Sequence, residues 1–102
     1  MPSSRYIDLT LGASDSSYTA PANGYFYIEN TLPLNAYFNM RIFFNNELLY
    51  TTTIHATNDG YNQADIIPVL KNYQFVVIYN EVRLTNYFRF IYAQGQRSII
   101  KI

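Results

Sequence analysis

The sequence predicts an all-β domain, an antiparallel β-sandwich of eight to nine short strands. Aromatic residues make up 18% of the chain, with 11 tyrosines and 7 phenylalanines, and such side chains favour pleated, half-buried surfaces. Apolar and polar residues alternate over several short segments, which is typical of strands with one buried face. Turn residues separate these segments at regular intervals, and no segment has helical spacing.

The first strands are bounded by characteristic turn residues. Residues 6–11 alternate between apolar and polar side chains, which predicts a half-buried strand. Residues 17–20 form a short strand that ends at Pro21, because proline has no backbone donor and belongs at a strand end or a sheet edge. The pair Asn23 and Gly24 readily adopts positive φ and is predicted to turn the chain into a strand over residues 25–30.

A hairpin in the middle of the chain is the clearest single feature. Residues 37–44 and 47–54 are both extended, and Asn45 and Asn46 separate them. Two asparagines suit the primed turns that join hairpin strands, because both positions need positive φ.

Four more strands are expected in the second half of the chain. Residues 61–70 are extended, and Pro68 confines them to a sheet edge or a bulge. A turn at Lys71 and Asn72 leads into residues 73–79, followed by residues 87–93, and residues 98–102 form a last apolar strand.

The alternation also predicts which side chains form the core. One face of the strands carries the following residues: Ile7, Leu9, Leu11, Phe26, Ile28, Phe38, Met40, Ile42, Phe44, Phe75, Val77, Phe88, Phe90 and Ile99.

Composition narrows the class of protein. A chain of 102 residues is expected to form one domain, either by itself or as one module of a longer protein. Seven basic and seven acidic residues cancel and are scattered, which argues against nucleic-acid binding. No apolar run approaches the ~20 residues of a membrane helix, no signal peptide is evident, and without cysteine there is neither a disulfide nor a thiolate metal site.

The chain is not expected to be an enzyme, and no cofactor or metal is expected. His55 is the single histidine, at the end of a strand, where a surface or hydrogen-bonded role is more usual than a catalytic one. The acidic residues are dispersed and form no recognisable catalytic spacing. Residues 58–60 with Asp65 resemble a calcium loop only faintly, so a solvated turn is the favoured interpretation.

If the domain has a ligand, the sequence places its site on residues 56–62, the most polar of the longer connections. Asn58, Asp59 and Asn62 are expected to hydrogen-bond sugar hydroxyls, and Tyr61 to stack on the apolar face of a sugar. The alternative is a solvated turn with no partner.

The aromatic content exceeds what one small core hides, which predicts a homo-oligomer. Phe43, Tyr87 and Tyr92 are the expected contributors to its interface, on faces opposite the predicted core.

Three segments resemble small β-sandwich domains of bacteriophage fibres and related appendages. Residues 18–26 (YTAPANGYF) resemble the first hairpin of those domains, residues 64–72 (ADIIPVLKN) a later hairpin, and residues 88–95 (FRFIYAQG) the last long strand. One departure is Asn72, where the pattern prefers glycine, although asparagine tolerates a left-handed turn position. Those domains are similar in plan to tumour necrosis factor-like and complement-type globular heads, which are jelly rolls that assemble as trimers.

The resemblance implies a jelly-roll-like module on the virion surface, bound to other virion proteins, such as a fibre knob that recognises a host receptor or glycan. Two alternatives remain open. One is a purely structural capsid decoration or fibre assembly domain, and the other is a carbohydrate-binding module of a bacterial protein, against which the absence of tryptophan counts. The same fold serves all three functions.

Overall fold

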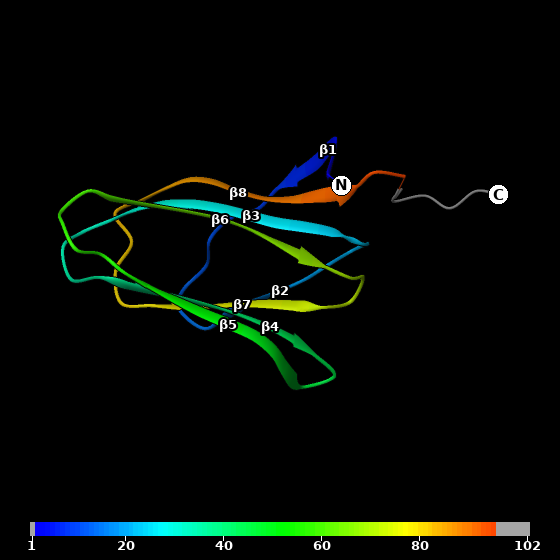
Figure 1. Cartoon of the computed structure of the whole chain (residues 1–102), viewed down its shortest axis with the longest axis horizontal. Coiled ribbons are helices and arrows are strands. Elements are labelled where there is room, and N and C mark those ends of the chain that lie inside the picture. The colour runs from blue at the N-terminus through cyan, green and yellow to red at the C-terminus, as the bar shows by residue number, and fades with distance from the viewer. Residues whose placement is uncertain (1, 96–102) are drawn as a thin grey trace.

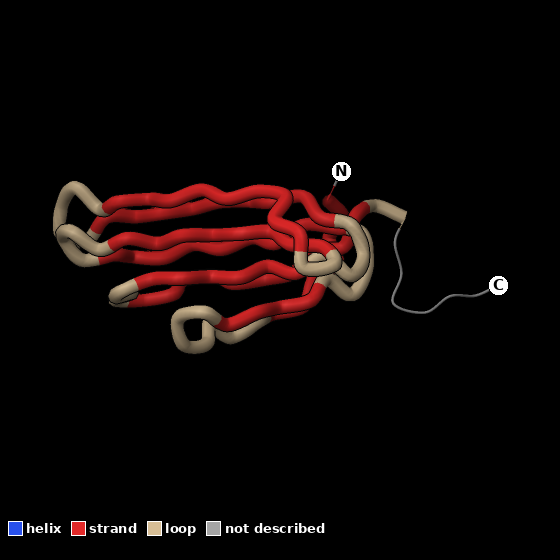
Figure 2. The backbone as a smooth tube through the Cα atoms, turned by 90° about the horizontal axis from the view of Figure 1, so that it is seen from below, coloured by secondary structure: helices blue, strands red, loops and turns tan. Residues whose placement is uncertain are grey.

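The structure, a computed structural model that describes residues 2–95, confirms the all-β prediction. Within these residues eight strands form two antiparallel sheets of four, which are the upper and lower layers in Figure 1. The strands run along the long axis of the molecule, and the described part of the chain contains no helix (Figure 2).

The strand order is that of a jelly roll. The upper sheet has the order β1-β8-β3-β6, with β1 (Pro2–Asp8), β8 (Leu84–Ala93), β3 (Gly24–Leu32) and β6 (Tyr61–Val69). The lower sheet has the order β2-β7-β4-β5, with β2 (Ser16–Thr19), β7 (Gln74–Tyr79), β4 (Tyr37–Phe44) and β5 (Glu47–His55). The antiparallel pairs are nested, β4 with β5 innermost, then β3 with β6, β2 with β7 and β1 with β8, which is the jelly-roll pattern.

Asparagines form the turns that the sequence predicts for them. Asn45 and Asn46 have φ of 50° and 65°, as the primed turn of the β4–β5 hairpin requires. Asn72 has φ of 73°, so it occupies a left-handed turn position without being glycine. The expectation that Pro68 lies on a sheet edge is also confirmed, since β6 is an edge strand.

Gly24 is required for a different reason from the one expected. Neither Asn23 nor Gly24 has positive φ, so that expectation was wrong. A Cβ atom at Gly24 would lie 2.3 Å from the carbonyl oxygen of Ile91 and 2.6 Å from Cζ of Phe90. Position 24 therefore needs glycine because the β8 backbone and a core ring approach it closely.

We expect Gly24→Ala to lower the free energy of unfolding by about 2 kcal/mol, the cost of forcing an extra methyl group into a packed core. Urea denaturation measures the change. Gly60→Ala is the matched comparison, because Gly60 has φ of 79° and no atom within 4 Å of the added Cβ, so only backbone strain of about 1 kcal/mol is expected there. A loss at Gly24 no larger than at Gly60 would argue against the close approach.

Phenylalanine rings join the two sheets in the centre of the core. The rings of Phe26 in β3 and Phe75 in β7 stack with centroids 4.9 Å apart. Phe90 meets Phe26 edge-on at 5.3 Å, and Phe88 meets Phe75 at 5.9 Å. These side chains come from both sheets and are almost fully buried, so the core is an aromatic layer between the sheets.

Most of the predicted core is confirmed. The correctly predicted buried residues are Phe26, Ile28, Phe38, Met40, Ile42, Phe75, Val77, Phe88 and Phe90, and Leu9 and Leu11 are partly buried against them. Buried residues that the sequence analysis missed include Leu32, Ile67, Val69, Tyr92 and four alanines. Ile99 and the predicted strand over residues 98–102 lie outside the described residues.

Two predicted core residues are exposed, Ile7 by 42% and Phe44 by 38%. Both belong to the inward side of their sheets, since Ile7 pairs with buried Phe90 and Phe44 lies two residues after buried Ile42. They are nevertheless uncovered, because Ile7 is on the edge strand β1 and Phe44 is at the tip of the β4–β5 hairpin. The alternation was correct for these residues, and the assumption that the opposite sheet covers them was wrong.

A small polar network lies inside the core. Asn30 and Gln63 are 0% and 2% exposed, and Nδ2 of Asn30 donates a 2.9 Å hydrogen bond to Oε1 of Gln63. The side-chain Nε2 of Gln63 also donates a 2.8 Å hydrogen bond to Oδ2 of Asp65. Within the described residues, Oδ1 of Asn30 has no hydrogen-bond partner. Because a buried polar group without a partner is costly, this network makes the β3–β6 pairing sensitive to substitution.

We expect Gln63→Leu, which keeps the volume and removes the acceptor for Asn30, to destabilise the fold by about 2 kcal/mol. The double variant Asn30→Leu/Gln63→Leu should recover most of this loss, because it removes both polar partners. Urea denaturation provides both values, with Asn62→Ala on the exposed side of β6 as a control that changes stability by less than about 0.5 kcal/mol. Equal losses in the single and double variants would contradict this account.

Candidate functional site

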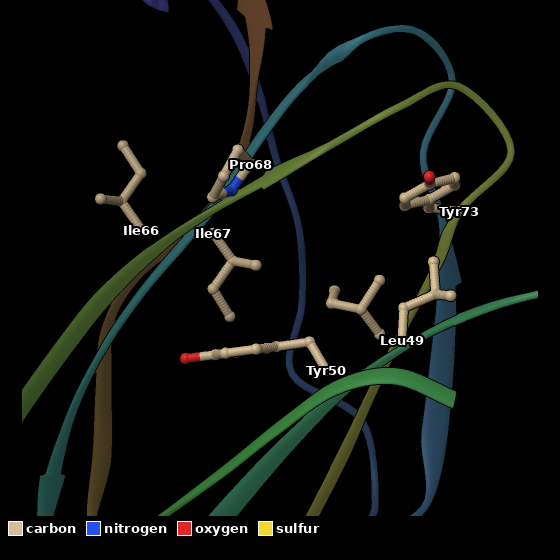
Figure 3. A pocket seen from close by; sticks show the side chains of 7 residues that line it. Leu49, Tyr50, Ile66, Ile67, Pro68 and Tyr73 are labelled. Carbon is tan, nitrogen blue, oxygen red and sulfur yellow. The ribbon is translucent and has the colours of Figure 1, made fainter. Parts of the chain in front are cut away.

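The sandwich is open on the side where β5 and β6 are the edge strands of their sheets. A cleft of about 350 Å³ lies there. Figure 3 shows that Leu49 and Tyr50 reach it from β5, and that Ile67 of β6 points toward the Tyr50 ring. The lining is completed by Ile42, Ile66, Pro68 and Tyr73. None of these seven described residues carries a charge.

Exposed apolar side chains surround the cleft. The tip of the β4–β5 hairpin and the end of β6 carry six of the eleven large hydrophobic side chains that are exposed among the described residues. We call these six residues the hairpin patch: Phe44, Leu48, Leu49, Tyr50, Ile66 and Leu70, between 38% and 54% exposed. Such a concentration of exposed apolar side chains at one edge of the sandwich is typical of an interaction surface.

The outer face of the upper sheet is rich in tyrosine. The register places Tyr27 of β3 beside Arg89 of β8, and Asp8 of β1 on the other side of Arg89. The Arg89 guanidinium lies 4.2 Å from the ring centroid of Tyr6 and 4.7 Å from that of Tyr87, and its Nε donates a 2.9 Å hydrogen bond to Asp8. Ion pairing and cation–π contacts therefore hold Arg89 in one orientation.

A second concavity borders this tyrosine-rich face. A groove of about 490 Å³ lies between the segment that follows β1 and the first half of β8. Its lining mixes apolar and polar residues: Asp8, Leu9, Thr10, Leu11, Thr85, Asn86, Tyr87, Phe88 and Arg89.

Tyr27 on the same face has a shifted pKa. Its hydroxyl donates a 2.7 Å hydrogen bond to the Glu29 carboxylate, and this bond, with partial burial and the charge of Glu29, raises the pKa of Tyr27 above its ordinary value. Because the folded-state pKa is raised, the associated stability is fully present below the unfolded value of about 10. It is lost as the pH rises through the folded-state pKa.

We expect Glu29→Gln to lower the pKa of Tyr27 toward its ordinary value, because the substitution removes the negative charge and weakens the acceptor. A pH titration of the tyrosine Cζ resonances by NMR measures the shift. Glu47→Gln in the other sheet is the control and should leave the Tyr27 titration unchanged. An unaltered Tyr27 pKa in Glu29→Gln would exclude the carboxylate as the cause.

Each residue of the predicted ligand loop has its own contacts in the structure. Asp59 pairs with Arg83 at 2.6 Å, which holds the pKa of Asp59 below its usual value. The Asn58 amide donates to the backbone oxygen of Asp59, and Tyr61 packs partly buried against the core. Asn62 lies apart from them and accepts a 3.2 Å hydrogen bond from Thr31.

The structure thus gives the four predicted residues different partners. Asp59 is engaged by Arg83, and the ring of Tyr61 is shared with the core. Asn62 instead belongs to a polar row on the outer face of the upper sheet, where Thr31 also lies 3.4 Å from the Asn86 amide of the groove. Asn62 thus connects the predicted loop to the groove.

The three predicted interface residues also lie in different surroundings. Tyr87 is 45% exposed on the tyrosine-rich face. Phe43 is half-buried and pairs with Leu48 of the hairpin patch. The placement of Tyr92 opposite the core was wrong, since it is only 6% exposed and meets Phe90 edge-on at 5.2 Å. Tyr92 lies two residues after Phe90 and four residues after Phe88 in the same strand, so its side chain points to the same, inward side of the sheet.

A run of consecutive apolar residues in the sequence indicates the hairpin patch, although the analysis of alternating apolar and polar residues overlooked it. Residues 48–50 are three consecutive apolar residues, and Phe43 and Phe44 precede them across the turn. A strand with one buried face does not require such runs. The structure accounts for this run by an irregular register between Ile42 and Phe43, which leaves Leu49 without a partner in β4.

Comparison with known proteins finds no matching family model, no matching curated protein and no matching solved structure. Among residues 2–95 there is no group of three His, Cys, Asp or Glu side chains that could hold a metal ion. His55 is exposed at the end of β5. The described part of the chain also has no helix long and apolar enough to cross a membrane.

Proposed function

We propose that the domain is a non-catalytic assembly module of a virion appendage, and that its copies associate through the hairpin patch. The observation that carries the proposal is the concentration of exposed apolar side chains around an uncharged cleft. At roughly half exposure, six large side chains offer on the order of 500 Å² of apolar surface. That is a large part of the roughly 800 Å² that one partner contributes to a standard interface.

The partner that we propose is another copy of the same chain. Because the cleft lining and the hairpin patch are uncharged, patches that meet around a symmetry axis bury apolar groups against one another and bring no unpaired charge into contact. Closed symmetry is the usual outcome for copies of one chain. The resemblance to phage fibre domains supports three subunits and a location on the virion surface.

The test is the molar mass in solution, measured by light scattering after size-exclusion chromatography. We expect the unaltered domain to have the mass of a trimer. Leu49→Glu and Ile66→Glu place a carboxylate in the hairpin patch and should weaken association by at least about 100-fold, since an unpaired charge is costly in an apolar interface.

Leu84→Glu is the matched control, because Leu84 is 57% exposed and lies outside the hairpin patch. It should leave the mass unchanged, and circular dichroism should show that all three variants keep the β fold. A monomeric mass for the unaltered domain over a wide concentration range would refute the assembly function. An oligomer that survives both patch substitutions would assign the interface to another surface.

A further inference from the structure

The groove beside β8 has the composition of a ligand site. Leu9, Leu11 and Phe88 supply its apolar part, and Phe88 is only 3% exposed. Asp8, Thr10, Thr85, Asn86 and Arg89 supply the polar groups. A volume of about 490 Å³ with a few convergent polar groups is typical of sites for small molecules.

The walls of the groove are held in place before any ligand binds. The backbone N–H of Leu9 donates a 2.8 Å hydrogen bond to the backbone carbonyl of Phe88. The hydroxyl of Tyr18 donates to the carbonyl of Thr10 at 3.0 Å and accepts from the amide of Gly12 at 2.6 Å. The segment that follows β1 is thereby fixed against both sheets, so a ligand would not have to order it.

The polar groups of the groove are planar, and two of them, Asp8 and Arg89, are in direct contact. Arg89 is fixed through its Nε bond to Asp8, and its Nη groups carry the remaining N–H donors of the guanidinium. The carboxylate of Asp8 is 72% exposed and offers further acceptor positions. The Asn86 amide combines a donor and an acceptor, and its contacts with Glu29 and Thr31 are long, at 3.5 and 3.4 Å.

This set of groups suits hydroxyls, because each hydroxyl both donates and accepts a hydrogen bond. It does not suit an anion, because the charge of Arg89 is already compensated by Asp8 at 2.9 Å. The Arg89 guanidinium lies 4.7 Å from the ring centroid of Tyr87. The ring is still 45% exposed in the groove lining, and this exposed part offers an apolar surface to C–H groups. Hydroxyls on one side of a ligand and C–H groups on the other describe a pyranose sugar.

We propose that this groove is a binding site for a neutral pyranose sugar, recognised by Asp8, Asn86 and Arg89 and packed against the ring of Tyr87. The site is independent of the proposed assembly. It lies at β1 and β8, whereas the hairpin patch lies at β5 and at β6, the opposite edge of the upper sheet. The loop over residues 56–62, where the sequence places a sugar site, is not part of it apart from the polar row that Asn62 joins through Thr31.

The test uses the ¹⁵N-labelled domain titrated with glucose, galactose, mannose, N-acetylglucosamine and, as the anionic comparison, sialyllactose. We expect at least one neutral sugar to shift the amide resonances of residues 8–11 and 85–89, with a Kd of about 1 mM. Asn86→Ala and Tyr87→Ala should weaken this binding at least about tenfold, which corresponds to about 1.4 kcal/mol. Tyr87→Phe, which keeps the ring, should bind nearly as well as the unaltered domain.

Asn58→Ala is the control, since Asn58 belongs to the loop over residues 56–62 and should leave sugar binding unchanged. The proposal is overturned if no neutral sugar shifts the groove resonances, if sialyllactose binds more tightly than every neutral sugar, or if the shifts map to residues 56–62. Asn86→Ala changes one exposed side chain, so it tests the site even if Tyr87→Ala fails to fold. If the domain is monomeric but binds a sugar in the groove, only the proposed assembly is refuted. If the domain is a trimer but binds no sugar in the groove, only the proposed sugar site is refuted.

Discussion

The contact between Phe26 and Phe75 is the constraint on which the rest of the structure depends. It is a stacked ring pair that crosses from one sheet to the other, and Phe88 and Phe90 close around it. Once Phe26 points inward, the alternation along β3 directs Tyr25 and Tyr27 outward, because successive side chains of a strand face opposite ways. A slip of one residue would exchange the core for the tyrosine-rich face, so the aromatic core also decides what the upper sheet presents to solvent.

The same core leaves the edges of the sandwich uncovered. The nested pairing of the jelly roll makes β1 and β6 the edges of one sheet and β2 and β5 the edges of the other. Side chains near these edges point inward without meeting the opposite sheet, as Ile7 does on β1. Between β5 and β6 the result is an apolar cleft, and the proposed assembly follows from what the core cannot cover.

The two proposed surfaces are compatible because they lie at opposite edges of the upper sheet, the groove beside β1 and the hairpin patch beside β6. Subunits that associate through the hairpin patch leave their grooves accessible. Several weak sugar sites on one assembly bind a surface far more tightly than a single site does, provided that the geometry lets them engage together. Assembly would thus turn a weak sugar contact into stable attachment.

The sequence by itself determined the local features of this protein. The positive φ of Asn45, Asn46 and Asn72, the edge position of Pro68 and the inward side of most strands follow from preferences of single residues or of close neighbours. Only the tertiary structure decided which inward side chains are covered, why position 24 must be glycine, and how Asp8 and Arg89 come together from the two ends of the chain. The physical reason is that alternation acts between neighbouring residues, whereas cover, close approach and the groove depend on strands that are distant in sequence and meet only in the folded sandwich.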